Sequence, residues 1–530
     1  MSKQSFIQGT MILLAAGIFS RILGFVPRIM LPRFMGAEGI GLYQLGYPLL
    51  ILILTLITGG LPLAVAKLVA QAESEGNSQK IKTILRTALS FAGTLGTLFM
   101  LAAWAGASWI TSHLLTDDRV YLTFLTMAPI ILIVSLSSVL RGYFQGKHNM
   151  IPTALSTTME TVIRCGAMLT LSYCLLPYGL DKAAAGAMAG VLLGELAGLA
   201  VLLIQCSHKR SSARSAAGTP NKAALTSLSA DPSAGKAGPF QMLRQLLTIS
   251  IPVTASKLVG SASYFLESIL IVQSLAVIGV TAREATALYG TLTGMIIPVM
   301  LLPTALTYSL SVSLVPSLSE AAAKQDFATI RKRMLQSIRI ALVTGVPFAV
   351  IMFMLSEPLC LVLYQDAAPA VYLKWMAPIA IFIYLQGPLQ AALQALDQPG
   401  TALLNTFIGA AVKLTLIYVL AAKAGLGIEG AIAAICLNMM LVTALHWNSV
   451  SRLIRFRLQL REWMVVLLGS MMMVLFISIA TRISPLEVMT IEFLLISFLS
   501  TMLYVLVMIA FGMINRADLM RVPWIGRLFK

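Results

Sequence analysis

The chain has 530 residues, of which 58% are hydrophobic and only 11% are charged. A soluble domain needs roughly a quarter of its residues charged to cover its surface, so this composition excludes a soluble globular protein. The formal net charge of +17 does not indicate a nucleic-acid partner, because no soluble domain is predicted to display it. We assign the excess to membrane orientation and to contact with lipid headgroups.

Apolar runs of about 20 residues, long enough to cross a hydrocarbon core of ~30 Å, recur along the whole sequence. Their patterning is helical and lacks the short alternating segments that are typical of an outer-membrane barrel. The predicted fold is therefore an all-α polytopic membrane protein with about 14 transmembrane helices. The predicted spans are 8–31, 42–70, 84–112, 120–140, 152–176, 183–205, 245–272, 285–315, 336–363, 372–395, 401–422, 428–450, 462–481 and 489–513.

The first apolar stretch, 11–19, superficially resembles a signal peptide. Arg21 follows it directly, the apolar pattern resumes to Leu31, and no small-x-small cleavage site is evident. We therefore interpret it as an uncleaved first span.

A polar stretch rich in Ser, Ala, Gly, Pro and Lys separates six spans from eight and is typical of a flexible linker. The predicted organisation has five parts. They are an N-terminal six-helix lobe at 1–205, a cytoplasmic linker at 206–242, a C-terminal six-helix lobe at 243–457, two additional transmembrane helices at 458–513, and a basic cytoplasmic tail at 514–530.

The two halves share sequence. At a shift of 246, Leu42 and Tyr43 recur as Leu288 and Tyr289, and at a shift of 249 the block 127–130 recurs as 376–379 and Arg164 meets Lys413. Six spans per repeat is an even number, so the copies would share one orientation, as in transporters whose halves rock around a central site.

The loops alternate in charge along the chain. One set carries most of the Lys and Arg residues, and the other holds only seven. Those seven are Arg33, Arg119, Lys182, Arg283, Lys374, Lys423 and Arg482. Because basic loops stay cytoplasmic, we expect a multi-pass protein of the bacterial cytoplasmic membrane with both termini in the cytoplasm.

Several charged residues fall inside the predicted spans, where they are costly and usually face a partner or a wet cavity. The basic ones, predicted to bind substrate, are Arg21, Arg28, Lys67, Arg164, Lys257 and Lys413. The acidic ones, predicted as ion-coupling candidates, are Glu160, Glu195 and Glu267. The positive excess favours an anionic passenger such as a phosphate or diphosphate.

Simpler interpretations stay open for three of these residues. Arg28 and Lys67 lie near span ends, where long side chains can snorkel to the headgroups. Arg164 lies four residues after Glu160, so the two can pair within one helix. Lys257 and Lys413 lie deeper and have no obvious partner on their own helices, which favours a cavity role.

No catalytic residue, metal site or cofactor is predicted. The five cysteines form no CxxC pair and the four histidines have no ligand spacing. No GxxxxGK[ST] loop is present, so hydrolysis of ATP by this chain is not expected.

Specific motifs carry a family resemblance. They are SRILGF at 20–25, GAEGIGLY at 36–43, RGYFQG at 141–146, MIPTA at 150–154, PTAL at 303–306 and SLVPSLSE at 313–320. Together they resemble the polysaccharide transporter branch of the multidrug/oligosaccharidyl-lipid/polysaccharide exporter superfamily. Within that branch the chain is most similar to the stage V sporulation protein B group, and it also resembles the lipid II flippases.

The resemblance implies a V-shaped, pseudo-symmetric pair of six-helix lobes around a cationic cavity that Arg21 of the first motif lines. It also implies that the last two spans form a groove for a lipid tail. The lipid II flippases place a second Arg where this chain has Pro27, one residue before Arg28. They also carry basic residues at places in the second and eighth spans where this chain has apolar or small residues.

The function expected from these features is that of a flippase for a lipid-linked anionic diphosphate oligosaccharide or peptidoglycan precursor, in cell-wall or spore cortex synthesis. The implied partners are a glycan of the undecaprenyl diphosphate type, membrane lipids and a glycan synthase or polymerase. Two alternatives remain. One is a drug or organic-cation exporter of the same superfamily, and the other is a membrane-embedded enzyme, which the short outer loops disfavour.

Overall fold

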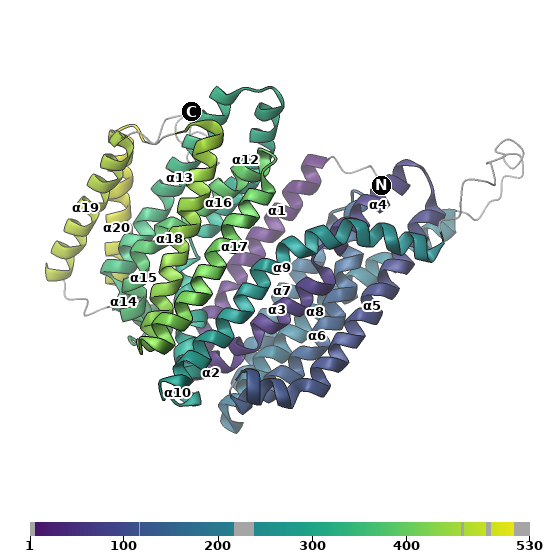
Figure 1. The fold of residues 1–530 in the computed structure, drawn as a ribbon, viewed down its shortest axis with the longest axis horizontal. Helices are drawn as coiled ribbons and strands as arrows, with labels where there is room; N and C mark the ends of the chain where they lie inside the picture. The colour runs from purple at the N-terminus through teal and green to yellow at the C-terminus, as the bar shows by residue number, and fades with distance from the viewer. Residues whose placement is uncertain (1–5, 116, 217–237, 457–459, 484–488, 514–530) are drawn as a thin grey trace, which may run out of the picture. The chain divides into compact units, whose positions relative to one another are not determined.

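The computed structural model describes residues 6–115, 117–216, 238–456, 460–483 and 489–513, and these form helices joined by short connections, without a strand (Figure 1). Within them, twelve segments are long and apolar enough to cross a membrane. The first of these, Ala15–Ser74, is 60 residues long and contains several helices. The predicted all-α polytopic fold is confirmed, and the number of about fourteen spans stays a prediction.

The chain packs as two compact units. The first unit contains Met1–Val272 and Ala282–Gly290, and the second contains Gln273–Thr281 and Thr291–Lys530. The predicted division placed the seventh span with the second lobe, whereas the helix α9 (Pro239–Val277) belongs to the first unit as far as Val272. The reason is hydrophobic packing, because Met242 and Leu246 are buried in one cluster with residues of the second and third predicted spans. The linker at 217–237 and the tail at 514–530 lie outside the described residues.

The first unit begins with short helices where two long spans are predicted. Helices α1 (Phe6–Leu23) and α2 (Phe25–Leu45) separate at Gly24, and α3 (Tyr47–Thr58) and α4 (Leu61–Ser74) separate at Gly59 and Gly60. Pro48 and Pro62 stand in the first turns of α3 and α4, where a missing N–H costs little. The remaining helices are α5 (Ser78–Trp109), α6 (Tyr121–Gly146), α7 (Ile151–Leu175), α8 (Leu180–Ala216) and α10 (Ala282–Gly290).

Helices α7 and α8 are packed backbone to backbone along a glycine stripe. Gly186, Gly190, Gly194 and Gly198 recur every four residues on α8 and so share one face. A Cβ at Gly190 would lie 2.3 Å from the backbone nitrogen of Met168. Small residues at this spacing allow membrane helices to approach closely, and this approach brings the polar side chains of α7 against α8.

Helices α2 and α10 carry the repeated Leu-Tyr motif and contact one another. A Cβ at Gly290 would lie 2.1 Å from the carbonyl oxygen of Ala37, and one at Gly41 would lie 2.0 Å from that of Thr286. Only glycine at both positions permits this approach, which explains why α10 packs with the first unit.

The second unit comprises ten α-helices among the described residues. They are α11 (Ile297–Met300), α12 (Thr304–Ala323), α13 (Phe327–Met354), α14 (Ser356–Tyr364), α15 (Ala370–Met376), α16 (Ala380–Ala395), α17 (Pro399–Leu416), α18 (Gly427–Ile454), α19 (Leu460–Ile483) and α20 (Met489–Ala510). The predicted ninth span, 336–363, is wrong in its limits. Its helix begins at Phe327, because Asp326 caps it by accepting a hydrogen bond from the Thr329 backbone at 3.0 Å, and it ends at Met354.

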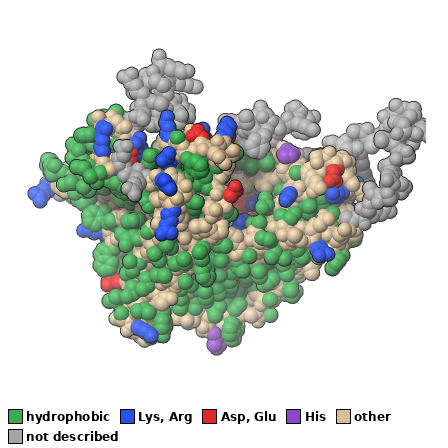
Figure 2. All heavy atoms as spheres, turned by 45° about the horizontal axis from the view of Figure 1, so that its top comes forward, with side chains coloured by type: hydrophobic (Ala, Val, Ile, Leu, Met, Phe, Trp, Pro, Cys, Tyr) green, Lys and Arg blue, Asp and Glu red, His purple; other side chains and the backbone are tan. Residues whose placement is uncertain are grey.

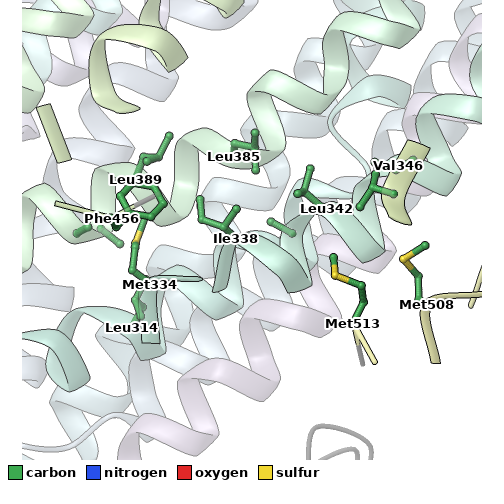
Figure 3. Packing of buried hydrophobic residues seen from close by; sticks show 14 of the residues in the cluster. Leu314, Met334, Ile338, Leu342, Val346, Leu385, Leu389, Phe456, Met508 and Met513 are labelled. Carbon is green, nitrogen blue, oxygen red and sulfur yellow. The ribbon is translucent and has the colours of Figure 1, made fainter. Parts of the chain in front are cut away.

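One hydrophobic core holds the second unit together and includes the last two helices. Met334, Ile338, Leu342 and Val346 line one face of α13 at helical spacing and pack with Met508 of α20 in the same cluster (Figure 3). At the start of α19 the buried carboxylate of Glu462 accepts hydrogen bonds from the Arg339 guanidinium of α13. The two added helices are therefore attached to this unit by an apolar face and a buried ion pair.

Much of the outer surface of both units is apolar. On the face drawn in Figure 2, hydrophobic side chains cover broad areas and charged side chains are sparse within them. Exposed large residues are dense on α19 and α20, among them Met464, Leu467, Phe498 and Met502. Such surfaces are stable in hydrocarbon and would aggregate in water.

The glycine stripe yields a stability prediction. Gly190→Ala places a methyl group against the Met168 backbone, so it should force α7 and α8 apart and lower stability by about 1–3 kcal/mol. Gly166→Ala on α7 is the control, because open space surrounds that position. Thermal unfolding in detergent should show a lower midpoint for Gly190→Ala alone, and equal midpoints would contradict the close packing.

Candidate functional site

Two arginines share one buried glutamate in the first unit. Glu160 of α7, with 8% of its side chain exposed, accepts a hydrogen bond on Oε1 from Arg164 Nη1 at 2.9 Å. Its Oε2 accepts one from Arg141 Nη2 of α6 at 2.6 Å. The predicted pairing of Glu160 with Arg164 is confirmed. Arg141 and Arg164 are called the arginine pair below.

A second carboxyl group adjoins this cluster from α8. Glu195 lies within electrostatic reach of Glu160 and of both members of the arginine pair. The glycine stripe permits this, because Gly194 and Gly198 flank Glu195 and lie directly against Arg164 and Glu160.

Tyrosines and a further arginine extend the polar region of the first unit. Tyr43 and Tyr47, whose ring centroids are 6.2 Å apart, both interact electrostatically with Arg164 and with Arg28. Tyr264 of α9 lies near Arg28, Tyr47 and the buried Glu267. In the part of the chain that the structure describes, no ion pair joins the exposed Arg28 to a carboxylate.

Lys257 has a partner that its own helix does not supply. Its Nζ donates a hydrogen bond to the Gly59 carbonyl oxygen at 2.7 Å, and the Gly60 N–H donates to Thr254 Oγ1 at 3.0 Å. These contacts satisfy backbone groups that the break between α3 and α4 leaves without helical partners. Lys257 is also exposed, so the capping contact does not remove its ammonium group from the surface.

Arg21 and Lys67 are both exposed, the first in the last turn of α1 and the second within α4. They stay candidates on the strength of the sequence.

Lys413 belongs to the second unit and is buried. It shares one face of α17 with Asn405 and Gly409. The residue four positions before Lys413 is Gly409, whereas the residue four positions before Arg164 is Glu160. On the same face Asn405 Nδ2 donates to Ser449 Oγ of α18 at 3.0 Å and lies 3.2 Å from Nδ1 of the buried His446. No sequence motif includes His446, and 41 residues separate it from Asn405.

A separate ion-pair network joins α2, the 117–119 loop and α10. Arg119 pairs with both Glu38 and Asp117, and Arg283 Nε donates to Glu38 Oε2 at 3.0 Å. Thr286 donates from Oγ1 to Oδ2 of the buried Asp117 at 2.7 Å. The network fixes α10 to α2 beside the close approach of Gly41 and Gly290.

The cluster around Glu160 shows what one-dimensional reasoning misses. Arg141 follows the end of the predicted span 120–140, so it counts with the loop charges, and no sequence motif singles out Tyr47 or Tyr264. Helix packing brings them to residues far along the chain. Within the described residues, no group of three His, Cys, Asp or Glu side chains has the arrangement of a metal site.

Comparisons with known proteins agree with this architecture. Residues 6–322, more than half of the chain, match the model of the family described as polysaccharide biosynthesis protein, and residues 261–419 match the MatE model. The chain belongs to the polysaccharide biosynthesis protein family. This places it among the polysaccharide transporters of the multidrug/oligosaccharidyl-lipid/polysaccharide exporter superfamily.

Curated relatives cover most or all of the chain. Stage V sporulation protein B of Bacillus subtilis (strain 168) is 39% identical over 537 residues, which cover 100% of this chain and 99% of that protein. Lipid II flippase MurJ of the same organism is 25% identical over 426 residues, covering 77% and 76% of the two chains.

Solved structures share the fold at low identity. A structure of lipid II flippase MurJ in an inward closed conformation has a TM-score of 0.69 at 14% identity and covers 96% of this chain and 100% of that chain. An inward-facing multidrug resistance MATE family transporter has a TM-score of 0.60 at 16% identity and covers 82% and 94%. These likenesses support the fold of a family transporter.

The contact of Lys257 with the helix break yields a prediction. Lys257→Met removes the donor from the Gly59 carbonyl and should lower stability by about 1 kcal/mol, the net value of one hydrogen bond. Lys82→Met, at an exposed lysine near the start of α5, is the control. If the two variants unfold at the same temperature in detergent, the contact with Gly59 contributes nothing.

Proposed function

We propose that the protein is a flippase that translocates a lipid-linked anionic diphosphate oligosaccharide or peptidoglycan precursor across the membrane. The observation that carries this proposal is the arginine pair, held by Glu160 within apolar helices. Its member Arg164 and the nearby Arg28 both interact with Tyr43 and Tyr47. Ionised groups at such depth are expensive and usually functional. Planar guanidinium groups match phosphate oxygens two at a time, so an anionic phosphate is the ligand this chemistry favours.

In the proposed mechanism no covalent bond is made or broken. The diphosphate and sugars pass through a polar region while the prenyl chain stays in lipid, and the two units alternate between inward-open and outward-open states that bind the headgroup differently. Arg28 and Arg164 are the leading substrate contacts, and Arg21, Lys67, Lys257 and Lys413 are further ones. An ion gradient or the membrane potential supplies the drive, with Glu160, Glu195 and Glu267 as coupling sites.

The relatives support the substrate class. A protein named for sporulation matches the whole chain, and one named lipid II flippase matches about three quarters of it. We therefore propose a substrate of the undecaprenyl diphosphate type, a role in cell-wall or spore cortex synthesis, and a glycan synthase or polymerase as partner. No chemistry in this chain is proposed beyond transport.

The charge asymmetry of the loops supports a location in the bacterial cytoplasmic membrane with both termini in the cytoplasm. Single cysteines introduced at Gln79 and at Glu429, in a cysteine-free background, test this. A membrane-impermeant maleimide added to intact cells should label position 429 and spare position 79 until the cells are lysed. The opposite pattern would reverse the orientation.

One observation favours a second candidate, which is a drug or organic-cation exporter, because residues 261–419 match the MatE model. Organic cations need an acidic site, whereas Arg28, which has no ion pair with a carboxylate among the described residues, repels them. Efflux of a cationic dye by cells that express the chain, without any effect on lipid-linked glycans, would favour the exporter.

Translocation in reconstituted vesicles tests the proposed function. Arg28→Gln combined with Arg164→Gln removes two cations from the polar region and should slow headgroup translocation at least tenfold, while the protein still folds. Lys82→Gln on the exposed start of α5 is the matched charge-neutral control and should translocate like the unmodified protein. Unimpaired translocation by the double variant would contradict the proposal that these arginines bind the headgroup.

A further inference from the structure

We propose that the tail at 514–530 docks in a pocket at one end of the second unit, where Trp524 enters the pocket and a neighbouring arginine pairs with Asp397. The docking is independent of which substrate the protein carries. It gives the tail a binding site on the same chain and gives the pocket an occupant.

The pocket lies among the ends of α12, α13, α16 and α18 and has a volume of about 370 Å³. All of its residues belong to the second unit. Helix α16 packs against both α12 and α18 (Figure 1). The wall is mostly apolar and includes Ala322, Phe327, Leu396, Leu453 and Ile454. Ligand pockets typically have volumes of about 300–1,000 Å³, so this one has room for an aromatic side chain.

Large apolar side chains of the pocket are exposed where lipid is not expected to cover them. Phe327 is 49% exposed and Leu453 is 40% exposed. Phe327 lies between the predicted spans 285–315 and 336–363, and Leu453 follows the predicted span 428–450. Apolar surface that faces water often marks a contact site. The pocket is therefore suited to an apolar group that arrives from the aqueous side.

The pocket also favours a positive charge. Counted over the described residues, Asp397 is the one charged residue in its lining, and it is exposed. The last residues of three helices, Ala323 of α12, Ala395 of α16 and Ile454 of α18, line the pocket as well. Helix C-termini carry partial negative charge and attract cations. An aromatic side chain next to a Lys or Arg residue therefore suits this pocket better than an anionic lipid headgroup does.

Basic residues near this end of the unit lie outside the lining. Lys324 pairs with Glu320, and Arg333 donates to a backbone carbonyl oxygen of α12. Arg452 and Arg455 are exposed at the end of α18. None of these four basic residues is among the described residues that line the pocket. The charged group that a docked side chain contacts there is therefore Asp397.

The tail has the composition that this pocket requires. Its segment RVPWIGRLF at 521–529 places Trp524 between Arg521 and Arg527. An indole buries a large apolar area, and tryptophan and arginine are enriched among residues that dominate binding. The linker at 217–237 also lies outside the described residues, but it contains no aromatic residue. The tail is therefore the segment of this chain that fits the pocket.

The tail leaves the second unit near α13, which forms part of the pocket. At the end of α20 the Phe511 carbonyl oxygen accepts a hydrogen bond from Arg461 Nη2 at 3.3 Å. The adjacent Glu462 is paired with Arg339 of α13. Arg339 follows Phe327 of the pocket by twelve residues on the same helix, which corresponds to a rise of about 18 Å.

The tail is long enough to cover this distance. Eleven residues lead from Met513 to Trp524, and an extended chain of that length spans up to roughly 35 Å. A tethered segment also acts at an effective concentration of about millimolar. The tail can therefore reach the pocket, and it is favoured over a partner that must arrive by diffusion.

Maleimide labelling of a cysteine in the pocket tests the proposal on the full chain in detergent. Ala322→Cys, in the cysteine-free background, places a thiol in the pocket wall. A docked tail shields this thiol, so Trp524→Ser should raise its labelling rate at least about fivefold. Ala517→Ser, which lies outside 521–529, is the matched tail control and should leave the rate unchanged. A cysteine introduced at Gln79 in the first unit should react equally in every tail variant.

Asp397→Asn tests the charge of the pocket. Asparagine tolerates the left-handed backbone conformation of this position, where φ is 57°, so the variant should fold. It should raise the labelling rate at position 322 about twofold, the effect of losing one exposed ion pair. Glu320→Gln, at an exposed carboxylate outside the pocket lining, is the control and should label like the unmodified protein.

A second cysteine in the tail identifies the occupant. Ala322→Cys combined with Ile525→Cys should form a disulfide within one chain on mild oxidation, because position 525 follows the docked Trp524. The product is a monomer with altered electrophoretic mobility, and its yield should fall when Asp397→Asn is added.

Three results would overturn the docking. Equal and fast labelling of Trp524→Ser and Ala517→Ser would show an open pocket, and equal and slow labelling would show that lipid or another protein covers it. A cross-linked dimer in place of the monomer would make a second copy of the chain the occupant. None of these results bears on flippase activity, which the translocation assay measures separately.

Discussion

An ionised side chain in the hydrocarbon core of a membrane needs a charged partner, a wet cavity or access to the headgroup region. Helix α7 meets this constraint most fully, because Glu160 is buried and yet accepts from two arginines on two helices. The same constraint governs Glu462, which is buried against Arg339 and holds α19 to α13. Each buried carboxylate in these two places therefore fixes one helix against another.

The Glu160 cluster depends on how closely two backbones can approach. Leucines in place of Gly190, Gly194 and Gly198 would hold α8 several ångströms from α7, and Glu195 would then lie away from Glu160. A stripe of residues without side chains thus determines where charged side chains meet. The close packing of uncharged glycines therefore determines which charged side chains of the site interact.

Breaks in the helices have a comparable role. Where α3 ends and α4 begins, backbone groups need partners that the helices no longer provide, and α9 supplies Thr254 and Lys257. This requirement, together with the burial of Met242 and Leu246, explains why the seventh span packs with the first unit as far as Val272. A lysine that appears unpaired in the sequence is therefore a cap for the broken helix.

Sequence alone determined the class of protein, because a chain with 11% charged residues and repeated apolar runs cannot fold as a soluble domain. It also predicted that Glu160 and Arg164 can pair, since residues four apart lie on one helix face whatever surrounds the helix. The tertiary structure alone decided that Arg141 and Glu195 join them, because these residues come from other helices and meet Glu160 only where glycines and helix ends allow. Local periodicity fixes neighbours within a helix, whereas contacts between helices depend on packing that no single segment encodes.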